Sequence, residues 1–200
     1  MNERVCAWRR CSGTGFLSTG SGQRHLRGMT LIELMVTIAI AAILAGLAAP
    51  SFKEMMANNQ LKSHASSLLS SLLQARGEAI KRNGQVVLCK SATGSECTTA
   101  GGWQQGWVMF ADADGDGVLD AGESVIQRTE TLTGNFSLTA ISDAVVVHRL
   151  TYAGSGSANG EQEVTFSLCK VGTSSGKARD IVLSPTGRPK IVEATVESCT

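Results

Sequence analysis

The segment Arg27-Gly28-Met29-Thr30-Leu31-Ile32-Glu33-Leu34 opens an apolar run that continues to Ala49. Residues 29–49 contain a single ionisable side chain, Glu33, and no proline. An α-helix rises about 1.5 Å per residue, so a helix over this run is about 30 Å long and matches the hydrocarbon core of a bilayer. A carboxylate near the start of such a helix is costly unless it has a partner. We therefore expect a membrane-spanning helix in which Glu33 has a specific role.

A free amino group is the candidate partner for the Glu33 carboxylate. If a peptidase cleaves the chain after Gly28, Met29 carries the new α-amine, and Glu33 lies one helical turn further on. In a bundle of such helices, the Glu33 carboxylate of one subunit can meet the Met29 amine of its neighbour. Neither charge is then isolated in hydrocarbon.

The stretch from Gly28 to Met35 closely resembles the class III signal of prepilins, which type IV pilins share with the pseudopilins of secretion systems. The resemblance implies cleavage between Gly28 and Met29 by a prepilin peptidase, N-methylation of Met29, and a role for Glu33 in subunit docking. The chain departs from the family in one respect, because Met29 stands where phenylalanine is usual. An ordinary secretory signal is the alternative, but its apolar core of about 7–15 residues is shorter than this run.

Residues 1–28 are therefore predicted to be a leader that is cleaved. The leader contains five arginines and one glutamate, an excess of positive charge that favours retention on the cytoplasmic side of the membrane. We expect residues 29–50 to form the transmembrane and fibre-core half of a helix, and residues 51–200 to form a periplasmic globular domain. The protein then crosses the inner membrane once before it enters a pilus or pseudopilus fibre.

Net charge gives no indication of a nucleic-acid partner. The whole chain has a formal charge of +1, and removal of the leader, with five positive charges and one negative charge, changes this to −3. Any binding to DNA must then come from a local basic patch.

Four cysteines follow the leader, and an even number in an exported domain predicts two disulfides. Three pairings are possible. We favour Cys89–Cys97, which closes a short loop of small polar residues, and Cys169–Cys199, which ties the end of the chain to a strand. Metal binding by the cysteines is the alternative, but the sequence has no Cys-x-x-Cys pair.

Beyond Pro50 the apolar pattern becomes amphipathic. Apolar residues recur at helical spacing, and Asn83-Gly84 is a typical helix end. The sequence therefore predicts one long helix over about residues 29–82, kinked at Pro50, whose second half needs a sheet to cover its apolar face. That face consists of Leu61, Ala65, Leu68, Leu72, Ala75 and Ala79.

After Gly84 the period changes to two, and turn residues separate short apolar runs. Several short antiparallel strands behind one long helix predict an α+β domain. The predicted strands cover residues 85–90, 106–111, 124–129, 135–140, 145–152, 163–169, 179–184 and 190–195.

Three segments of the domain narrow the resemblance to one family of pilins and pseudopilins. They are Gln74–Asn83, Gly102–Phe110 with the acidic residues that follow it, and Ile181–Lys190. Together they are similar to the GspH/FimT family, which contains the H-type minor pseudopilins of type II secretion and the FimT and FimU minor pilins. The resemblance implies a type IV pilin-like fold and a structural role in a fibre, with other major and minor subunits and an inner-membrane assembly platform as partners. It leaves open whether the fibre is a type IV pilus, with this subunit at the tip or in the initiation complex, or a type II pseudopilus.

The acidic segment has the spacing of a calcium loop. Asp112, Asp114, Asp116, Asp120 and Glu123 fit the pattern D-x-D-x-D-G-x5-E, with Asp120 at the ninth position. However, an EF-hand has helices on both sides, whereas the flanking residues here are strand-like, and aspartate and glycine also suit a turn without a metal. Two interpretations stay open: a solvated hairpin without a cofactor, and a calcium site.

Basic residues near the C-terminal hairpin are candidates for binding DNA: Arg188, Lys190, Lys177 and Arg179. The stretch Gly187-Arg188-Pro189-Lys190 resembles the Gly-Arg-x-Arg motif that is associated with DNA uptake in FimT-type pilins. Lysine in place of the second arginine still neutralises a phosphate but loses the bidentate fork. A few such contacts give weak, salt-sensitive binding. The alternative is that these side chains are solvated charges that protect an edge strand.

The sequence contains no motif of a serine hydrolase, a zinc protease or a phosphate-binding loop. We therefore expect a protein that acts by assembly and has no enzymatic activity.

Overall fold

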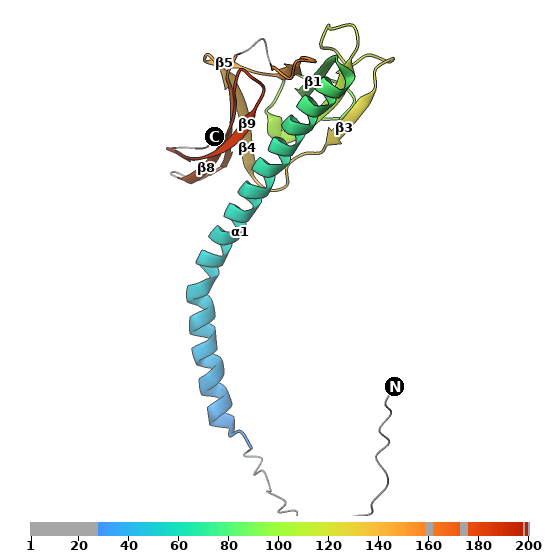
Figure 1. Ribbon diagram of the computed structural model, residues 1–200. Coiled ribbons are helices and arrows are strands. Elements are labelled where there is room, and N and C mark those ends of the chain that lie inside the picture. The colour runs from blue at the N-terminus through green and yellow to red at the C-terminus, as the bar shows by residue number, and fades with distance from the viewer. Residues whose placement is uncertain (1–27, 159–161, 173–175, 198, 200) are drawn as a thin grey trace, which may run out of the picture. The chain divides into compact units, whose positions relative to one another are not determined.

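The computed structural model describes residues 28–158, 162–172, 176–197 and 199 of the 200-residue chain. The chain divides into two compact units, Met1–Gly46 and Leu47–Thr200. Helix α1 (Leu31–Arg82) begins in the first unit and ends in the second, and the strands lie in the second (Figure 1). Of the predicted leader, residues 1–28, all but Gly28 lie outside the described residues.

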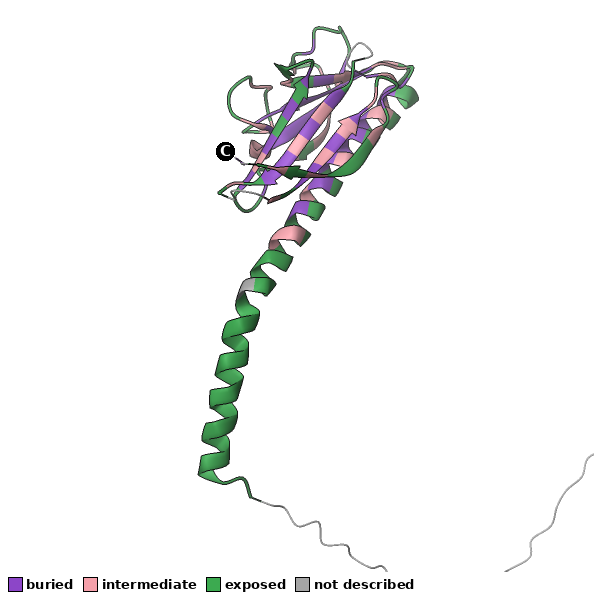
Figure 2. Ribbon diagram, turned by 90° about the vertical axis from the view of Figure 1, so that its left-hand side faces the viewer, coloured by how far each residue is buried: buried purple, intermediate pink, exposed green. Residues whose placement is uncertain are grey.

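In the first unit, the described part of the chain is the start of α1. Every residue from Gly28 to Gly46 is exposed (Figure 2), although almost all of them are apolar. By its length and composition α1 can cross a membrane. An uncovered apolar helix of this length needs a bilayer or other subunits around it. The assigned helix continues through Pro50, and the kink at this position stays a prediction.

Helix α1 ends where the sequence predicts. Asn83 has a positive φ of 49°, and the Gly84 N–H donates a hydrogen bond to the Ala79 carbonyl (3.2 Å). A left-handed residue followed by a hydrogen bond back to the last turn satisfies carbonyls that the helix leaves free.

The C-terminal part of α1 buries the predicted apolar face. Its six residues are at most 2 % exposed, and they form one core with side chains of both sheets. Two contacts fix the helix on the strands: Trp107 Nε1 donates to Ser71 Oγ (3.1 Å), and the His64 ring lies edge-on against Phe136 with centroids 5.0 Å apart. The six residues are Leu61, Ala65, Leu68, Leu72, Ala75 and Ala79.

The strands form two antiparallel sheets, with the orders β3-β2-β1-β6 and β5-β4-β7-β8-β9. A short 3-10 helix, Trp103–Gln105, precedes β2. The strands are β1 (Gln85–Lys90), β2 (Trp107–Asp112), β3 (Val125–Thr129), β4 (Phe136–Ser142), β5 (Val145–Val146), β6 (Arg149–Tyr152), β7 (Val164–Lys170), β8 (Gly176–Leu183) and β9 (Pro189–Val196).

The prediction of one continuous strand over residues 145–152 is wrong. β5 pairs with β4 in one sheet, and β6 pairs with β1 in the other. The chain changes sheets between Val147, whose N–H donates to the Ala140 carbonyl, and His148, whose carbonyl accepts from the Lys90 N–H. The other predicted strands are present, and their ends shift by at most three residues.

Strand β1 is buried on both faces. Val86 and Leu88 face the main core under α1, whereas Val87 and Cys89 belong to a second, smaller core with Val108 and Phe110 of β2. Leu119 of the acidic segment and Cys97 pack on this smaller core. The acidic segment and the loop after β1 therefore cover the outer face of the four-stranded sheet.

The structure contains both favoured disulfides. Cys89–Cys97 joins β1 to the loop that follows it, with Cα atoms 5.6 Å apart. Cys169–Cys199 joins β7 to the C-terminal end across 30 residues of sequence, with Cα atoms 6.0 Å apart.

Candidate functional site

The first turn of α1 holds Glu33 in a capped helix start. Thr30 Oγ1 accepts a hydrogen bond from the Glu33 N–H (3.3 Å), so Thr30 occupies the N-cap position and Glu33 the third helical position. Thr30-x-x-Glu33 has the spacing of a capping box, which the sequence analysis missed. The positive end of the helix dipole also favours a carboxylate here. Glu33 can thus stabilise the helix start as well as dock a neighbour, and the adjacent Met29 is 62 % exposed.

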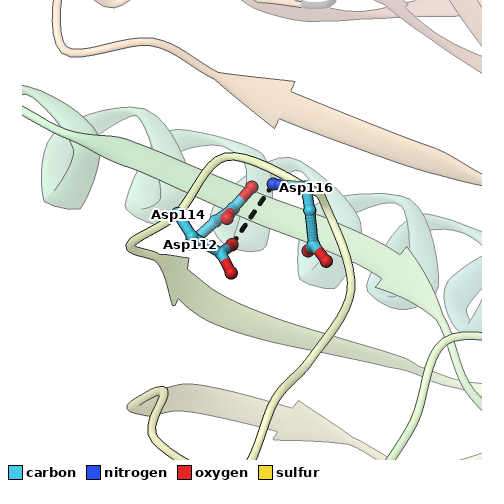
Figure 3. A group of neighbouring side chains, drawn as sticks. All are labelled: Asp112, Asp114 and Asp116. Carbon is cyan, nitrogen blue, oxygen red and sulfur yellow. Dashed lines mark hydrogen bonds between the residues drawn. The ribbon is translucent and has the colours of Figure 1, made fainter.

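The acidic segment after β2 is built around Asp112. This residue is only 4 % exposed, and its carboxylate accepts hydrogen bonds from the Gly115 N–H (2.7 Å) and the Gly117 N–H (3.1 Å). Asp114 and Asp116 lie beside it, and one oxygen of each of the three carboxylates is within 4.8 Å of the others (Figure 3). Three of the five predicted calcium ligands therefore converge.

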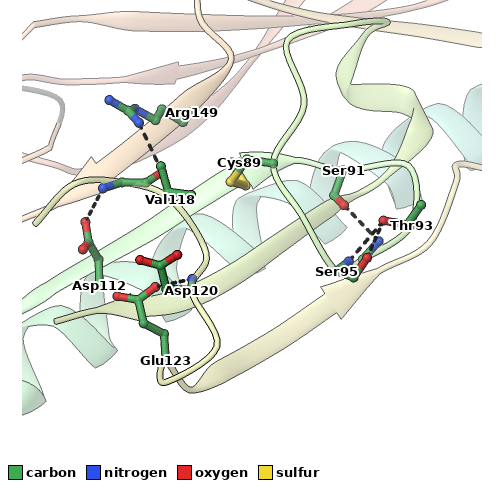
Figure 4. Close-up of a disulfide and its surroundings, with 12 residues drawn as sticks. Cys89, Ser91, Thr93, Ser95, Asp112, Val118, Asp120, Glu123 and Arg149 are labelled. Atoms are coloured by element: carbon green, nitrogen blue, oxygen red, sulfur yellow. Dashed lines mark hydrogen bonds between the residues drawn. A yellow bond between two sulfur atoms is a disulfide. The ribbon is translucent and has the colours of Figure 1, made fainter. Parts of the chain in front are cut away.

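The two remaining predicted ligands, Asp120 and Glu123, come last in the sequence of the segment and lie beside each other (Figure 4). The Glu123 carboxylate accepts from the Ala113 N–H (2.8 Å) and the Asp120 N–H (3.2 Å), which closes the segment on itself. The Asp116 carboxylate, together with partial desolvation and the other acids, raises the pKa of Asp120, which is exposed. Oxygens of Asp112 and Glu123 already accept backbone hydrogen bonds, so the segment is ordered by its own contacts. Calcium binding stays a prediction.

The four basic residues predicted to bind DNA do not form one patch. Arg179 is 6 % exposed, and its Nη2 lies 2.9 Å from Glu193 Oε1. Lys177 lies near the other end of β8 from the β8–β9 turn, with Nζ 3.8 Å from Glu54 Oε1. Arg188 lies at that turn, and Lys190 pairs with Val182 close to it. Arg188 and Lys190 are exposed.

Arg188 has a different cationic neighbour, which the sequence analysis missed. Arg188 and Arg76 of α1 line one hollow, and Arg76 Nε donates to the Gly156 carbonyl (3.0 Å). Hydroxyl side chains complete the lining: Ser155, Ser157 and Thr186. Two guanidinium groups beside three hydroxyl groups can bind a phosphate or another anion. Only the packing of the helix on the loop reveals Arg76, because it lies more than 100 residues from Arg188 in the sequence.

Gly187 places Arg188 beside this hollow. It has a φ of +76°, and a Cβ at this position would overlap the Gly156 carbonyl and touch the Tyr152 ring. The Gly187 N–H donates to the Ser184 carbonyl (2.8 Å), and the Arg188 carbonyl accepts from the Ser184 N–H (3.1 Å). The glycine of the Gly-Arg-Pro-Lys stretch thus has a structural role in a tight turn.

Comparison with known families gives two matches. Residues 23–49 match the family described as "Prokaryotic N-terminal methylation motif", and residues 64–187 match "Type II transport protein GspH". The second match covers more than half of the chain and extends from the buried part of α1 to the β8–β9 turn.

Similar individual proteins are consistent with these two family matches. A protein of Pseudomonas aeruginosa described as "Fimbrial protein" is 33 % identical over 125 residues, which are 60 % of this chain and 76 % of the relative. The crystal structure of the type IV minor pilin FimU from P. aeruginosa matches with a TM-score of 0.54 and 22 % identity, over 72 % of this chain and 97 % of FimU. A second crystal form of FimU gives a TM-score of 0.50 and 24 % identity, over 70 % of this chain and all of FimU. At these identities the two structures show that the fold is that of a type IV minor pilin. The family match over residues 64–187 shows that the chain belongs to the GspH family of minor pilins and pseudopilins.

Proposed function

We propose that this minor subunit initiates or caps a type IV pilus or a related fibre, and that it enters the fibre through the Glu33 carboxylate. The observation that carries the proposal is the isolation of this charge. Glu33 is the single ionisable side chain in the exposed apolar stretch from Met29 to Ala49. In hydrocarbon such a carboxylate needs a cationic partner, and the α-amine of a processed neighbour provides one.

The proposed pathway begins at the inner membrane. The basic leader holds the precursor with its N-terminus in the cytoplasm and its domain in the periplasm. A prepilin peptidase cleaves after Gly28, and the Met29 amine is methylated. The assembly platform then brings the apolar helices of several subunits together, so that they form the fibre core and the sheet domains face outward.

Substitution of Glu33 tests this proposal. In a strain that assembles the fibre, we expect the variants Glu33→Ala and Glu33→Gln to be processed and to fold, because the domain core begins at Leu61. Their amount in sheared fibres should fall at least about tenfold, because the α-amine of the neighbouring subunit loses its carboxylate partner. A tenfold change corresponds to only about 1.4 kcal/mol, and an unpaired charge in hydrocarbon costs more. Quantitative immunoblots of the fibre and membrane fractions measure this.

The variant Thr30→Ala is the matched control. It removes the N-cap hydrogen bond to Glu33 but keeps the carboxylate, so it separates helix capping from docking. We expect Thr30→Ala to enter the fibre nearly as well as the unmodified protein. Normal incorporation of Glu33→Ala would remove the basis of the proposed docking.

A second candidate function is DNA binding at the hollow shared by Arg76 and Arg188. The observation that favours it is the presence of two arginines and three hydroxyl side chains in one hollow, whereas Arg179 is engaged by Glu193. Such a site suits a phosphate of the DNA backbone, without sequence preference. The resemblance of residues 187–190 to the Gly-Arg-x-Arg motif of FimT-type pilins, with Lys190 in place of the second arginine, supports the same function.

Salt-dependent binding of duplex DNA tests this second function. The complete processed chain in an uncharged detergent is titrated with labelled DNA at several salt concentrations. We expect Arg188→Ala to weaken binding at low salt and to reduce the slope of log K against log salt by about 0.9, the value for one phosphate contact. Lys177→Ala is the control, because this lysine lies in a separate patch beside Glu54. Absence of binding at low salt, or equal effects of both variants, would argue against the site.

A further inference from the structure

A second hollow, a groove of about 720 Å³, lies between the acidic segment and the chain around β5. Three segments and Gln162 line this groove. The segments are the end of the Cys89–Cys97 loop (Glu96–Thr99), the middle of the acidic segment (Gly117–Leu119), and residues 142–149 around β5. Figure 4 shows the acidic segment with Val118 and Arg149 next to the disulfide. Neither the fibre-docking residues nor the candidate DNA site belongs to it.

Aliphatic side chains give the groove an apolar lining. Val145 is 66 % exposed and Val118 is 50 % exposed, and both line the groove together with Val147 and Leu119. Single exposed aliphatic residues are common on protein surfaces, but a contiguous group around a groove indicates a binding surface.

The contacts behind the lining hold the groove in a fixed shape. The disulfide anchors the Glu96–Thr99 segment to β1, and Lys90 Nζ donates to the carbonyls of Thr99 (2.8 Å) and Gly101 (2.6 Å). The Asp112 carboxylate holds the Gly117 N–H on the other side. A preformed groove loses little conformational freedom when a partner binds.

Acidic groups predominate around the groove. Glu96 and Asp143 line it, and Asp116 and Asp120 lie directly before and after the lining segment Gly117–Leu119. The cation in the lining is Arg149, and its Nη1 donates to the carbonyls of Asp116 and Gly117 (both 3.2 Å). Repulsion by the Asp116 carboxylate is the main cause of the raised pKa of Asp120, and the other acids of the same segment add to it. A partner that supplies positive charge relieves this repulsion.

A second copy of this chain is a poor match for the groove. Its exposed aliphatic residues with basic neighbours include Ile80 of α1, where Lys81 and Arg82 already pair with Glu78, and Ile191 and Val192 of the edge strand β9, next to Lys190. However, Glu193 follows directly, with an 83 % exposed side chain. A β9 strand in the groove would therefore bring a carboxylate to an acidic rim.

We propose that this groove docks an apolar side chain flanked by lysine or arginine on a different subunit of the same fibre. The proposal rests on the proposed function, since it requires a fibre of several kinds of subunit. The apolar side chain enters between Val118 and Val145, and its basic neighbours meet Glu96 and Asp143 at the rim. Contacts of this kind determine which neighbour a subunit accepts, in addition to the shared packing of the helices.

Site-specific cross-linking in a strain that assembles the fibre tests the proposal. The photoreactive residue p-benzoylphenylalanine is incorporated in the full chain at Val145 and, separately, at Val118. We expect both positions to cross-link to one different fibre subunit, and mass spectrometry to place the adduct on an apolar residue next to lysine or arginine. Val192 of β9, which is also exposed and lies in the strand at the other edge of the five-stranded sheet from β5, is the control position and should give a different product or none.

Charge reversal adds a second measurement. The double variant Glu96→Lys and Asp143→Lys should lower the yield at Val145 at least about fivefold, because like charges then face each other, and should leave the yield at Val192 unchanged. Adducts on a second copy of this chain, adducts unaffected by charge reversal, or no adduct at either position in strains with normal fibres would each overturn the proposal. If Glu33→Ala still lowers incorporation, the proposed function stands even when the groove proposal fails.

Discussion

At the scale of single residues, Gly187 shows how one position fixes the geometry of a candidate site. Its positive φ and its closeness to the Gly156 carbonyl leave no room for a side chain. We expect Gly187→Ala to lower the free energy of unfolding by about 1–3 kcal/mol, the range for strained backbone, plus the effect of the overlap. Urea unfolding of the complete processed chain in an uncharged detergent, followed by tryptophan fluorescence, measures the change.

Gly172→Ala is the matched control for this substitution. Gly172 also has a positive φ (+84°), but a Cβ there has open space around it. The variant therefore carries the backbone strain without the overlap, and we expect it to destabilise the protein less than Gly187→Ala does. Equal losses would mean that close packing against Gly156 is not what requires glycine in the turn.

At the scale of elements, the acidic segment after β2 can be tested as a scaffold and as a calcium site. Asp112 is buried and accepts two backbone hydrogen bonds, whereas Asp114 is exposed. In the presence of a chelator, we expect Asp112→Ala to lower the free energy of unfolding by about 1–3 kcal/mol, because buried amide groups lose their acceptor. Asp114→Ala should change it by less than about 0.5 kcal/mol.

Added calcium distinguishes the two interpretations of this segment. If the ion binds the three converging carboxylates, calcium should raise the melting temperature of the unmodified protein but not that of Asp116→Asn. Equal melting temperatures with calcium and with chelator would leave the solvated hairpin as the correct interpretation.

The elements differ in how far the sequence predicts them. Helix α1 is predicted to its end because its period, its apolar face and the Asn83-Gly84 stop all agree. The two sheets were not predicted, because the run from Val145 to Tyr152 contains no glycine or proline to mark the change of sheet at Val147. Pairing partners depend on contacts that are distant in sequence, which periodicity does not reveal.

The candidate sites also differ in how far the sequence predicts them. Glu33 and the cysteine pairs could be located from local sequence, because one lies in a distinctive motif and the others are few in number. Arg76, and the groove around Val118 and Val145, could not, since each combines segments that only the tertiary fold brings together. The prediction that Lys177 and Arg179 lie beside Arg188 is wrong, because the β8–β9 register, which local sequence does not reveal, separates these residues.

At the scale of the whole molecule, the pH dependence of stability depends on His148, which lies where the chain passes between the two sheets. Burial lowers the pKa of His148, and the positive charge of Lys90 lowers it further. Its Nδ1 is buried and has no hydrogen-bond partner among the residues that the structure describes. The folded protein therefore takes up a proton at this imidazole at a lower pH than the unfolded chain, in which histidine has its ordinary pKa of 6.5.

The sign of the effect follows from proton binding. Below about pH 6.5 the unfolded state binds more protons than the folded state, so the free energy of unfolding falls as the pH falls, by at most about 1.4 kcal/mol per pH unit for one group. We expect urea unfolding midpoints of the processed chain to decrease between pH 7 and pH 5, and the variant His148→Gln to show a smaller decrease. The backbone of Val147 and His148 joins the two sheets, so this crossing is the place where a pH-dependent loss of stability would act on both. Parallel curves for the two proteins would show that another group controls the acid response.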